Sequence, residues 1–211
     1  MEIAFASNNK HKLEEVRQIL SGLPLTIHSL ADLGLEVEIS EDGQTFRENA
    51  LIKAHLAAKA SGMISLADDS GLEVDALNGA PGVRSARFAG DKADSSQNNK
   101  LLLEKLKNVP FDQRTARFRC VLALVTLAGE EHLWDGTCEG LIGFEEHGQR
   151  GFGYDPLFIL PAYQKTLAEL GPEIKNKLSH RAMALKNALP YLTRIIHLSQ
   201  LIPSPSGRGL G

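Results

Sequence analysis

One stretch, residues 117–124, constrains the possible folds of this chain more than any other, because its side chains alternate as they do in a strand. Every second position there is apolar and would point to the same face of a sheet: Phe118, Cys120, Leu122 and Leu124. A turn at Gly129-Glu130 separates this stretch from a second run, His132–Cys138, which we expect to be its hairpin partner. The chain is therefore predicted to contain at least one long antiparallel hairpin.

Helical patterns occur between short strands in the first third of the chain. The apolar run Ile3–Ala6 ends at a polar turn, and apolar residues at helical spacing follow it. A second helix is predicted from Phe46 to Ser61, because Thr45 and Glu48 form a capping-box pattern in front of it. Gly62 stands where a C-terminal cap belongs. The opening of the chain is thus typical of an α/β protein.

The remaining elements follow from similar signals. Further strands are predicted at Leu35–Ile39, Ile64–Ala67 and Leu157–Leu160, and a third helix from Ser96 to Lys107. Ser179 caps a last helix, which Pro190 is expected to kink or to split in two. Crossover helices together with a long hairpin predict one catalytic α/β domain over residues 1–202, followed by a flexible tail at residues 203–211.

Charge and cysteine content narrow the class of protein. The formal net charge is −3, which argues against a general nucleic-acid binder but leaves room for a small anionic ligand. Two cysteines do not make a disulfide framework. The N-terminus lacks the basic start and apolar core of a signal peptide, and no apolar run approaches the roughly 20 residues that span a membrane. We therefore expect a cytoplasmic protein with no membrane partner.

Polar residues between the first strand and the first helix form a candidate phosphate site. Ser7, Asn9 and Lys12 stand at the expected helix N-terminus, where backbone N–H groups and the helix dipole attract anions. The glycines and the Gly-Lys-Ser/Thr ending of a Walker A loop are missing. The alternative is that Ser7 or Asn8 merely caps the helix while Lys10 and Lys12 are solvated.

Two neighbouring acids, Asp68 and Asp69, follow the strand predicted at Ile64–Ala67, and the isolated acid Glu41 precedes them. Adjacent carboxylates at a strand end require opposite charge nearby, and a divalent cation is the usual answer. Hard oxygen ligands suit Mg²⁺, and a carboxylate beside it can take a proton from attacking water. The alternative is that Asp68-Asp69-Ser70-Gly71 is an ordinary turn.

Aromatic and basic residues in the last third of the chain could bind a planar base. Phe152-Gly153-Tyr154-Asp155 follows a glycine-rich approach, and aromatic faces with small neighbours can sandwich a base. Arg181 offers fixed N–H donors to a phosphate or to a purine O6. Each residue also has a structural explanation: aromatics pack cores, His180 is a satisfied histidine, and Lys53 is a solvated helix lysine.

In order and spacing, these motifs resemble the inosine/xanthosine triphosphate pyrophosphatases, which remove deaminated purine nucleotides. The resemblance runs from Ile3 to about Leu198. Its blocks are Ser7-x-Asn9-x-x-Lys12, Glu41 with Thr45-Phe46-x-Glu48-Asn49-Ala50, Asp68-Asp69-Ser70-Gly71-Leu72, Gly79-Ala80-Pro81-Gly82-Val83-x-Ser85-Ala86-Arg87, Phe152-Gly153-Tyr154-Asp155-Pro156 and Ser179-His180-Arg181.

The resemblance implies a fold, a metal and a set of roles. It implies an elongated two-lobed α/β unit around a long mixed β-sheet with flanking helices, and a homodimer. Asp69 would be the general base and would hold Mg²⁺ together with Glu41. Substrate would be bound by Ser7, Asn8, Asn9, Lys10, His11, Lys12, Lys53, Ser70, Phe152, Gly153, Tyr154, Asp155, Lys175, His180 and Arg181.

The implied reaction converts ITP, dITP or XTP to the monophosphate and pyrophosphate. Donors aimed at O6 would be left unpaired by the amino group of adenine, which can cost a factor of roughly 10⁴. One alternative is a pyrophosphatase for other modified nucleotides, and another is a regulator that binds nucleotide without turnover.

Overall fold

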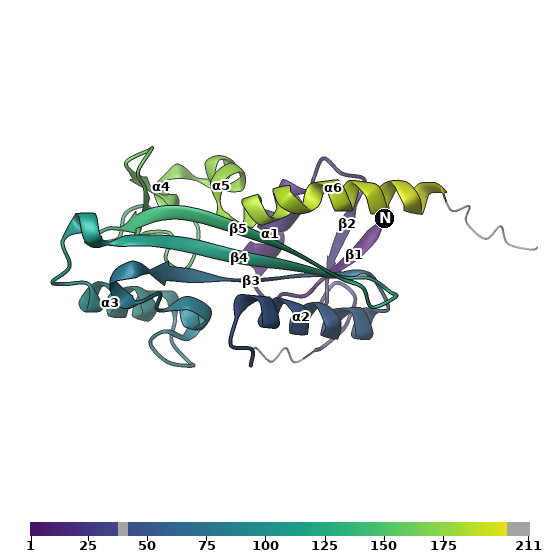
Figure 1. Ribbon diagram of the computed structural model, residues 1–211, viewed down its shortest axis with the longest axis horizontal. Helices are drawn as coiled ribbons and strands as arrows, with labels where there is room; N and C mark the ends of the chain where they lie inside the picture. Colours follow the sequence, from purple (N-terminus) through teal and green to yellow (C-terminus); the bar gives the residue numbers. More distant parts are fainter. Residues whose placement is uncertain (38–41, 202–211) are drawn as a thin grey trace, which may run out of the picture.

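A mixed sheet forms the centre of the computed structural model, which describes residues 1–37 and 42–201 (Figure 1). Its seven strands lie in the order β2-β1-β3-β4-β5-β6-β7. The pairs β1–β2 and β1–β3 are parallel, and the other pairs are antiparallel. The strands are β1 (Glu2–Phe5), β2 (Thr26–Ser29), β3 (Ser65–Val74), β4 (Thr115–Val125), β5 (Glu131–Ile142), β6 (Phe158–Leu160) and β7 (Lys165–Thr166). The predicted mixed α/β sheet with a long hairpin is confirmed.

Helices cover both faces of this sheet, and the molecule is elongated along β3, β4 and β5 (Figure 1). The helices are α1 (Lys10–Ile19), α2 (Phe46–Ser61), α3 (Ser95–Lys105), α4 (Leu167–Leu170), α5 (Pro172–Leu178) and α6 (His180–Leu201), with 3-10 helices η1 (Asp75–Leu77), η2 (Gly82–Arg87) and η3 (Phe111–Gln113). One apolar core joins α1 and α6 to the sheet, and another joins α2 to the opposite face. None of the helices in the described ranges is long and apolar enough to cross a membrane.

Local sequence signals place the ends of α2 as predicted. The Thr45 hydroxyl accepts from the backbone N–H of Glu48, whose side chain in turn caps the start of the helix. Gly62 closes the helix in the left-handed conformation, with a φ of 65°.

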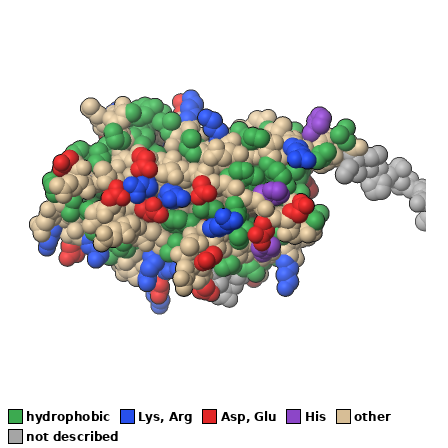
Figure 2. All heavy atoms as spheres, viewed as in Figure 1, with side chains coloured by type: hydrophobic (Ala, Val, Ile, Leu, Met, Phe, Trp, Pro, Cys, Tyr) green, Lys and Arg blue, Asp and Glu red, His purple; other side chains and the backbone are tan. Residues whose placement is uncertain are grey.

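Charged side chains of both signs are interspersed over the visible face of the molecule (Figure 2).

Two predicted features differ in the structure. Residues 35–37 are not in a strand, and the rest of the predicted strand Leu35–Ile39 lies outside the described residues. The second strand is instead Thr26–Ser29, which pairs with β1 in parallel and buries Ile27. Pro190 does not split the last helix, because its ring is exposed while Ala188 and Leu192 on either side pack against the sheet.

The strand predicted at Ile64–Ala67 is longer than expected. As β3, it continues to Val74, because each of its residues pairs with β4, including Asp69 with Val121. The interpretation of Asp68-Asp69-Ser70-Gly71 as a turn is therefore wrong. Since side chains alternate along a strand, the two acids point to opposite faces of the sheet.

Candidate active site

A cleft opens at the free edge of β3. The short strand β1 pairs with β3 at Ser65 and Leu66, so β3 extends past the end of its neighbour. Residues 69–71 of β3 line the resulting cleft, which has a volume of about 640 Å³. The end of β1, the start of α1, η2 and the residues before α3 form the other walls. The fold thus leaves residues 69–71 of an otherwise buried strand accessible to a ligand.

The N-terminus of α1 borders this cleft. The Asn9 side chain accepts from the backbone N–H groups of His11 (3.0 Å) and Lys12 (3.3 Å), and the Ser7 hydroxyl accepts from the Asn9 N–H (3.2 Å). The cap is therefore Asn9, not Ser7 or Asn8 as the alternative interpretation held, and Asn9 also lines the cleft. Lys12 is not solvated: its ammonium lies 3.1 Å from a carboxylate oxygen of Asp68.

Asp69 points toward α2. One of its carboxylate oxygens lies 2.7 Å from the ammonium of Lys53, and the other accepts from the Asn49 side-chain amide at 3.2 Å. Lys53 is 3% exposed, so its interpretation as a solvated helix lysine is wrong. The amide of Asn49 was not predicted as part of the site, although its block, Thr45 to Ala50, carried the resemblance. This arrangement places the Asp69 carboxylate at the cleft wall, beside the buried ammonium of Lys53.

Asp68 points to the other face and is closed off from solvent. Its carboxylate accepts from Arg181 at 2.8 and 3.2 Å and from the Ser70 hydroxyl at 3.3 Å. Burial alone would raise the pKa of Asp68, but the charges of Arg181, Lys12 and Lys53 outweigh it and hold that pKa far below its usual range. Asp68 is thus an ionised partner in a buried charge cluster.

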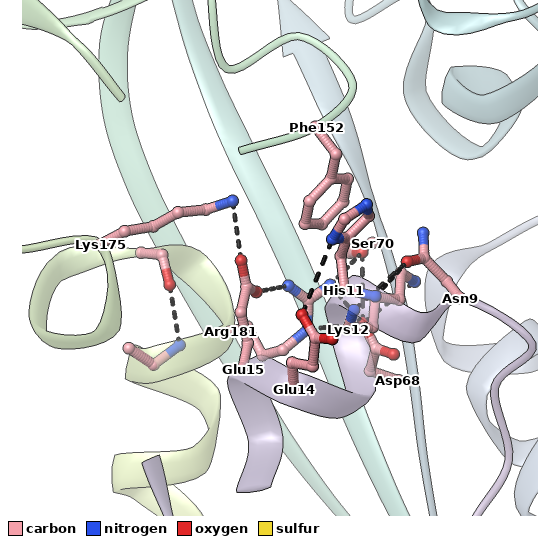
Figure 3. A network of polar contacts seen from close by, with 12 residues as sticks. Asn9, His11, Lys12, Glu14, Glu15, Asp68, Ser70, Phe152, Lys175 and Arg181 are labelled. Carbon is pink, nitrogen blue, oxygen red and sulfur yellow. Dashed lines mark hydrogen bonds and ion pairs between the residues drawn. The ribbon is translucent and has the colours of Figure 1, made fainter. Parts of the chain in front are cut away.

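The same cluster continues through α1 to the last third of the chain (Figure 3). Glu15 of α1 binds Arg181 and lies 2.7 Å from the ammonium of Lys175. Lys175 also lies 2.6 Å from the carboxylate of Asp155, whose pKa is raised because burial outweighs the lysine's charge. Glu15 was missed in the sequence, where its spacing three residues after Lys12 was the available signal.

Aromatic rings form the far side of the cleft. The Phe152 ring stacks on His11 with centroids 5.4 Å apart, and the Lys175 ammonium lies 4.2 Å from the same ring. His180 stacks on Phe118 at 4.8 Å, and burial, together with Arg181 and Lys175, lowers the pKa of His180 well below its usual value. The imidazole is therefore neutral at pH 7. Phe118 was predicted as a strand residue and was not recognised as a lining residue.

The structure brings most of the predicted catalytic and substrate-binding residues together. Those that line the cleft are Ser7, Asn8, Asn9, His11, Lys12, Lys53, Asp69, Ser70, Phe152, Gly153, Tyr154, Asp155, Lys175 and His180. Lys10 is exposed outside it. Arg181 is fully buried behind the wall, with its guanidinium bound to Asp68, Ser70 and Glu15. It is an organiser of the site in this structure.

The donor set suits a cation that brings most of its own ligands. Glu41, the other predicted metal ligand, lies outside the described residues. Within the described part of the chain, no group of three or more His, Cys, Asp or Glu could hold a metal ion. Asp69 offers carboxylate oxygens at the cleft. Mg²⁺ usually binds one or two carboxylates and takes its other ligands from water and substrate phosphates, so the Asp69 carboxylate is a suitable ligand for it.

Comparisons with known proteins agree with this geometry. The model of the Ham1 family matches residues 3–191. The chain belongs to the Ham1 family. It is 50% identical to the dITP/XTP pyrophosphatase of Desulforamulus reducens over 92% of this chain and 97% of that protein. It is 48% identical to the dITP/XTP pyrophosphatase of Bacillus subtilis over 88% and 93% of the two chains.

Solved Ham1 structures have the same fold. The Ham1 protein of Staphylococcus aureus superposes with a TM-score of 0.82 at 39% identity, over 92% of this chain and 100% of that one. The HAM1 protein of Coxiella burnetii gives 0.83 at 42% identity, over 92% and 99%. The long mixed sheet is therefore the fold of the Ham1 family.

Proposed function

We propose that this chain hydrolyses non-standard purine nucleoside triphosphates, namely ITP, dITP and XTP, to the monophosphate and pyrophosphate. The named activity of the curated relatives supports the reaction, because those proteins are dITP/XTP pyrophosphatases at about half sequence identity. The observation that carries the proposal is the pairing of Asp69 with Lys53 at 2.7 Å on the wall of a cleft that also holds the N-terminus of α1.

The triphosphate binds between α1 and α2. The start of α1 offers the positive end of the helix dipole, next to Ser7 and Asn9. Lys12 and Lys53 add positive charge from the two sides of β3. These charges are fixed before substrate arrives, so little reorganisation is required when charge develops in the transition state.

Asp69 acts as the general base. Its carboxylate takes a proton from a water molecule whose oxygen forms a bond to the α-phosphorus. The bond between the α-phosphorus and the bridging oxygen to the β-phosphate breaks, and pyrophosphate leaves with that oxygen. Lys53, beside Asp69, keeps the carboxylate ionised and stabilises the negative charge on the phosphate oxygens. Asn49 holds the second carboxylate oxygen in place.

The metal in this proposal is Mg²⁺, held by Asp69 and Glu41 and by the substrate's own phosphates. When bound, it neutralises charge on the triphosphate and orients it. We further propose that the enzyme is a cytoplasmic homodimer with no nucleic-acid or membrane partner, in keeping with the family resemblance. Light scattering after size exclusion tests the dimer directly.

Base recognition falls to the aromatic side of the cleft. The rings of Phe152 and His11 stack on each other, so a purine can stack on a ring face that this contact leaves open. His180 lines the cleft and is neutral, and its buried Nδ1 has no hydrogen-bond partner in the part of the chain that the structure describes. A donor directed at O6 favours hypoxanthine and xanthine over adenine, whose amino group leaves it unpaired.

A substrate panel tests this proposal. Pyrophosphate release from ITP, XTP, GTP, ATP and CTP is measured with Mg²⁺ or EDTA, for the wild type and for Asp69→Asn. The expected result is fast, Mg²⁺-dependent turnover of ITP and XTP that the variant loses. Equal turnover of all the nucleotides would contradict it, and so would release of orthophosphate alone. Tight binding of ITP without turnover would instead identify a regulator.

A further inference from the structure

The block Gly79–Arg87 contributed to the family resemblance but has no part in the reaction proposed above. In the structure it forms η2 and the turn before it, and Val83, Ser85 and Ala86 line the cleft. This segment lies along β3 where β1 has ended: the backbone of Val74 bonds to Ala80 at 3.2 Å. It therefore covers the part of the strand edge that follows the catalytic carboxylate.

Ser85 joins this segment to β3. Its hydroxyl accepts from the backbone N–H of Leu72 at 2.8 Å and donates to the carbonyl of Gly82 at 2.6 Å. The contact is tight, because a Cβ at Gly71 would lie 2.4 Å from the Gly82 carbonyl oxygen and 2.5 Å from the Ser85 hydroxyl. Ser85 is 7% exposed, so the hydroxyl satisfies a backbone donor that is shielded from water.

Tyr154 joins the same residue to the base side of the cleft. Its hydroxyl donates to the backbone carbonyl of Ser85 at 2.8 Å, and the side chain is buried. Phe152, which offers the stacking face, lies two residues before Tyr154, and Asp155, which holds Lys175, directly follows it. The hydroxyl of Tyr154 thus binds the protein itself, although the residue lines the cleft.

We propose that Tyr154 and Ser85 are positioning residues that fix the base-binding loop relative to the catalytic strand. The hydrogen bonds run from the loop through Ser85 to Leu72, three residues after Asp69. These hydrogen bonds thereby fix the position of a purine that stacks on Phe152 relative to the Asp69 carboxylate, which activates water. This inference rests on the proposed function and adds to it a device that makes turnover depend on the base.

Selectivity between two substrates separates positioning from a merely structural role. Initial rates with ITP and, at high enzyme concentration, with ATP are measured for the wild type, Tyr154→Phe, Ser85→Ala and the double variant. Tyr154→Phe deletes one oxygen atom, and we expect kcat/KM for ITP to fall about tenfold, the effect of one lost hydrogen bond. ATP, which lacks O6, should lose less than about twofold, so the ratio of ITP to ATP falls.

The double variant tests the chain of contacts. Because both residues act through one path, its loss with ITP should be close to that of the worse single variant. Losses that multiply, or a ratio of ITP to ATP that stays constant, would overturn the inference. Should Ser85→Ala fail to fold, the ratio for Tyr154→Phe decides alone.

Tyr163→Phe is the matched control, because Tyr163 is 43% exposed and outside the cleft, and it should behave as the wild type. The wild type separates the two proposals. If it releases no pyrophosphate from ITP, the proposed function fails, whereas turnover by the wild type with an unchanged ratio in Tyr154→Phe rejects the inference alone.

Discussion

Strand β3 holds two adjacent carboxylates in different surroundings. Asp69 faces α2 and the cleft, where its carboxylate contacts the Lys53 ammonium and the Asn49 side-chain amide. Asp68 faces α1 and α6, where Lys12 and Arg181 surround it and no solvent reaches it. The two side chains have the same chemistry and are covalent neighbours. Their difference shows that in this fold the face of the sheet, and not the residue type, decides which carboxylate lines the cleft.

The largest effect on activity should follow from changing Asp69, on the face of β3 that borders the cleft. We expect Asp69→Asn to lower kcat for ITP about 10³-fold, because the amide cannot take a proton from water. The free energy of unfolding, measured with urea, should change far less than the activity. A variant that keeps more than a tenth of the wild-type kcat would remove Asp69 from the role of base.

A change on the other face of β3, where Asp68 is buried against α1 and α6, should lower the stability of the protein. Asp68→Asn leaves the buried charges of Lys12 and Arg181 with one partner fewer, and we expect a loss of about 3 kcal/mol in the free energy of unfolding. Urea unfolding measures this loss. At a temperature where the variant is folded, kcat should stay within about tenfold of the wild type. A variant with full stability but lost activity would instead make Asp68 the candidate base and Asp69 the structural carboxylate.

The face of the sheet on which Asp68 lies is covered by α6, which packs very closely against β5. A Cβ at Gly136 would lie 2.0 Å from the carbonyl oxygen of His180 and 2.3 Å from the backbone nitrogen of Ala184. Gly136→Ala should therefore cost about 2 kcal/mol of unfolding free energy, as overpacking does. Gly22→Ala is the control, because a Cβ there meets nothing within 4 Å. Equal stability of both variants in urea would show that α6 is not fixed at this contact.

The pH dependence of stability should depend on His180, the first residue of α6. The pKa of His180 is lowered in the folded protein, so below its unfolded value of about 6.5 the unfolded chain binds a proton that the folded chain does not. Stability from this residue is thus present above pH 6.5 and is lost as the pH falls. Urea unfolding from pH 7 to pH 5 should show a smaller decrease for His180→Phe than for the wild type. Parallel decreases would contradict the assignment.

The smallest effect is expected at Lys10. This residue was predicted to bind substrate, but it is exposed outside the cleft, so Lys10→Ala should change kcat/KM for ITP less than about twofold. Lys12→Ala in the same assay should lose far more, since that ammonium lies beside the cleft and binds Asp68. Similar losses in both variants would show that the whole loop contacts phosphate.

Signals that are local in the chain predicted much of the fold. The caps of α2 and the alternation around Phe118 depend on neighbours a few residues apart, and the structure confirms them. The length of β3 could not be predicted in this way, because pairing with β4 extends it through Asp68 and Asp69. Strand β2 was missed for a similar reason, since parallel pairing with β1 stabilises it.

The candidate site divides along the same line. The predicted substrate-binding residues gather around one cleft as the resemblance implied, apart from Lys10 and Arg181, and Glu41 lies outside the described residues. The partners that organise them, Glu15 and Asn49, are ordinary helix residues in the sequence and acquire importance through contacts with distant segments. Which of two adjacent acids faces the cleft depends on strand register, which composition and spacing do not encode.

The position of bond cleavage tests the central claim most directly. ITP is hydrolysed in water enriched in ¹⁸O with Mg²⁺ present, and the products are analysed by mass spectrometry. Attack on the α-phosphorus, with Asp69 taking the proton from water, predicts one labelled oxygen in the inosine monophosphate and none in the pyrophosphate. Label in the pyrophosphate, or in free orthophosphate, would place the attack at another phosphorus and contradict the account.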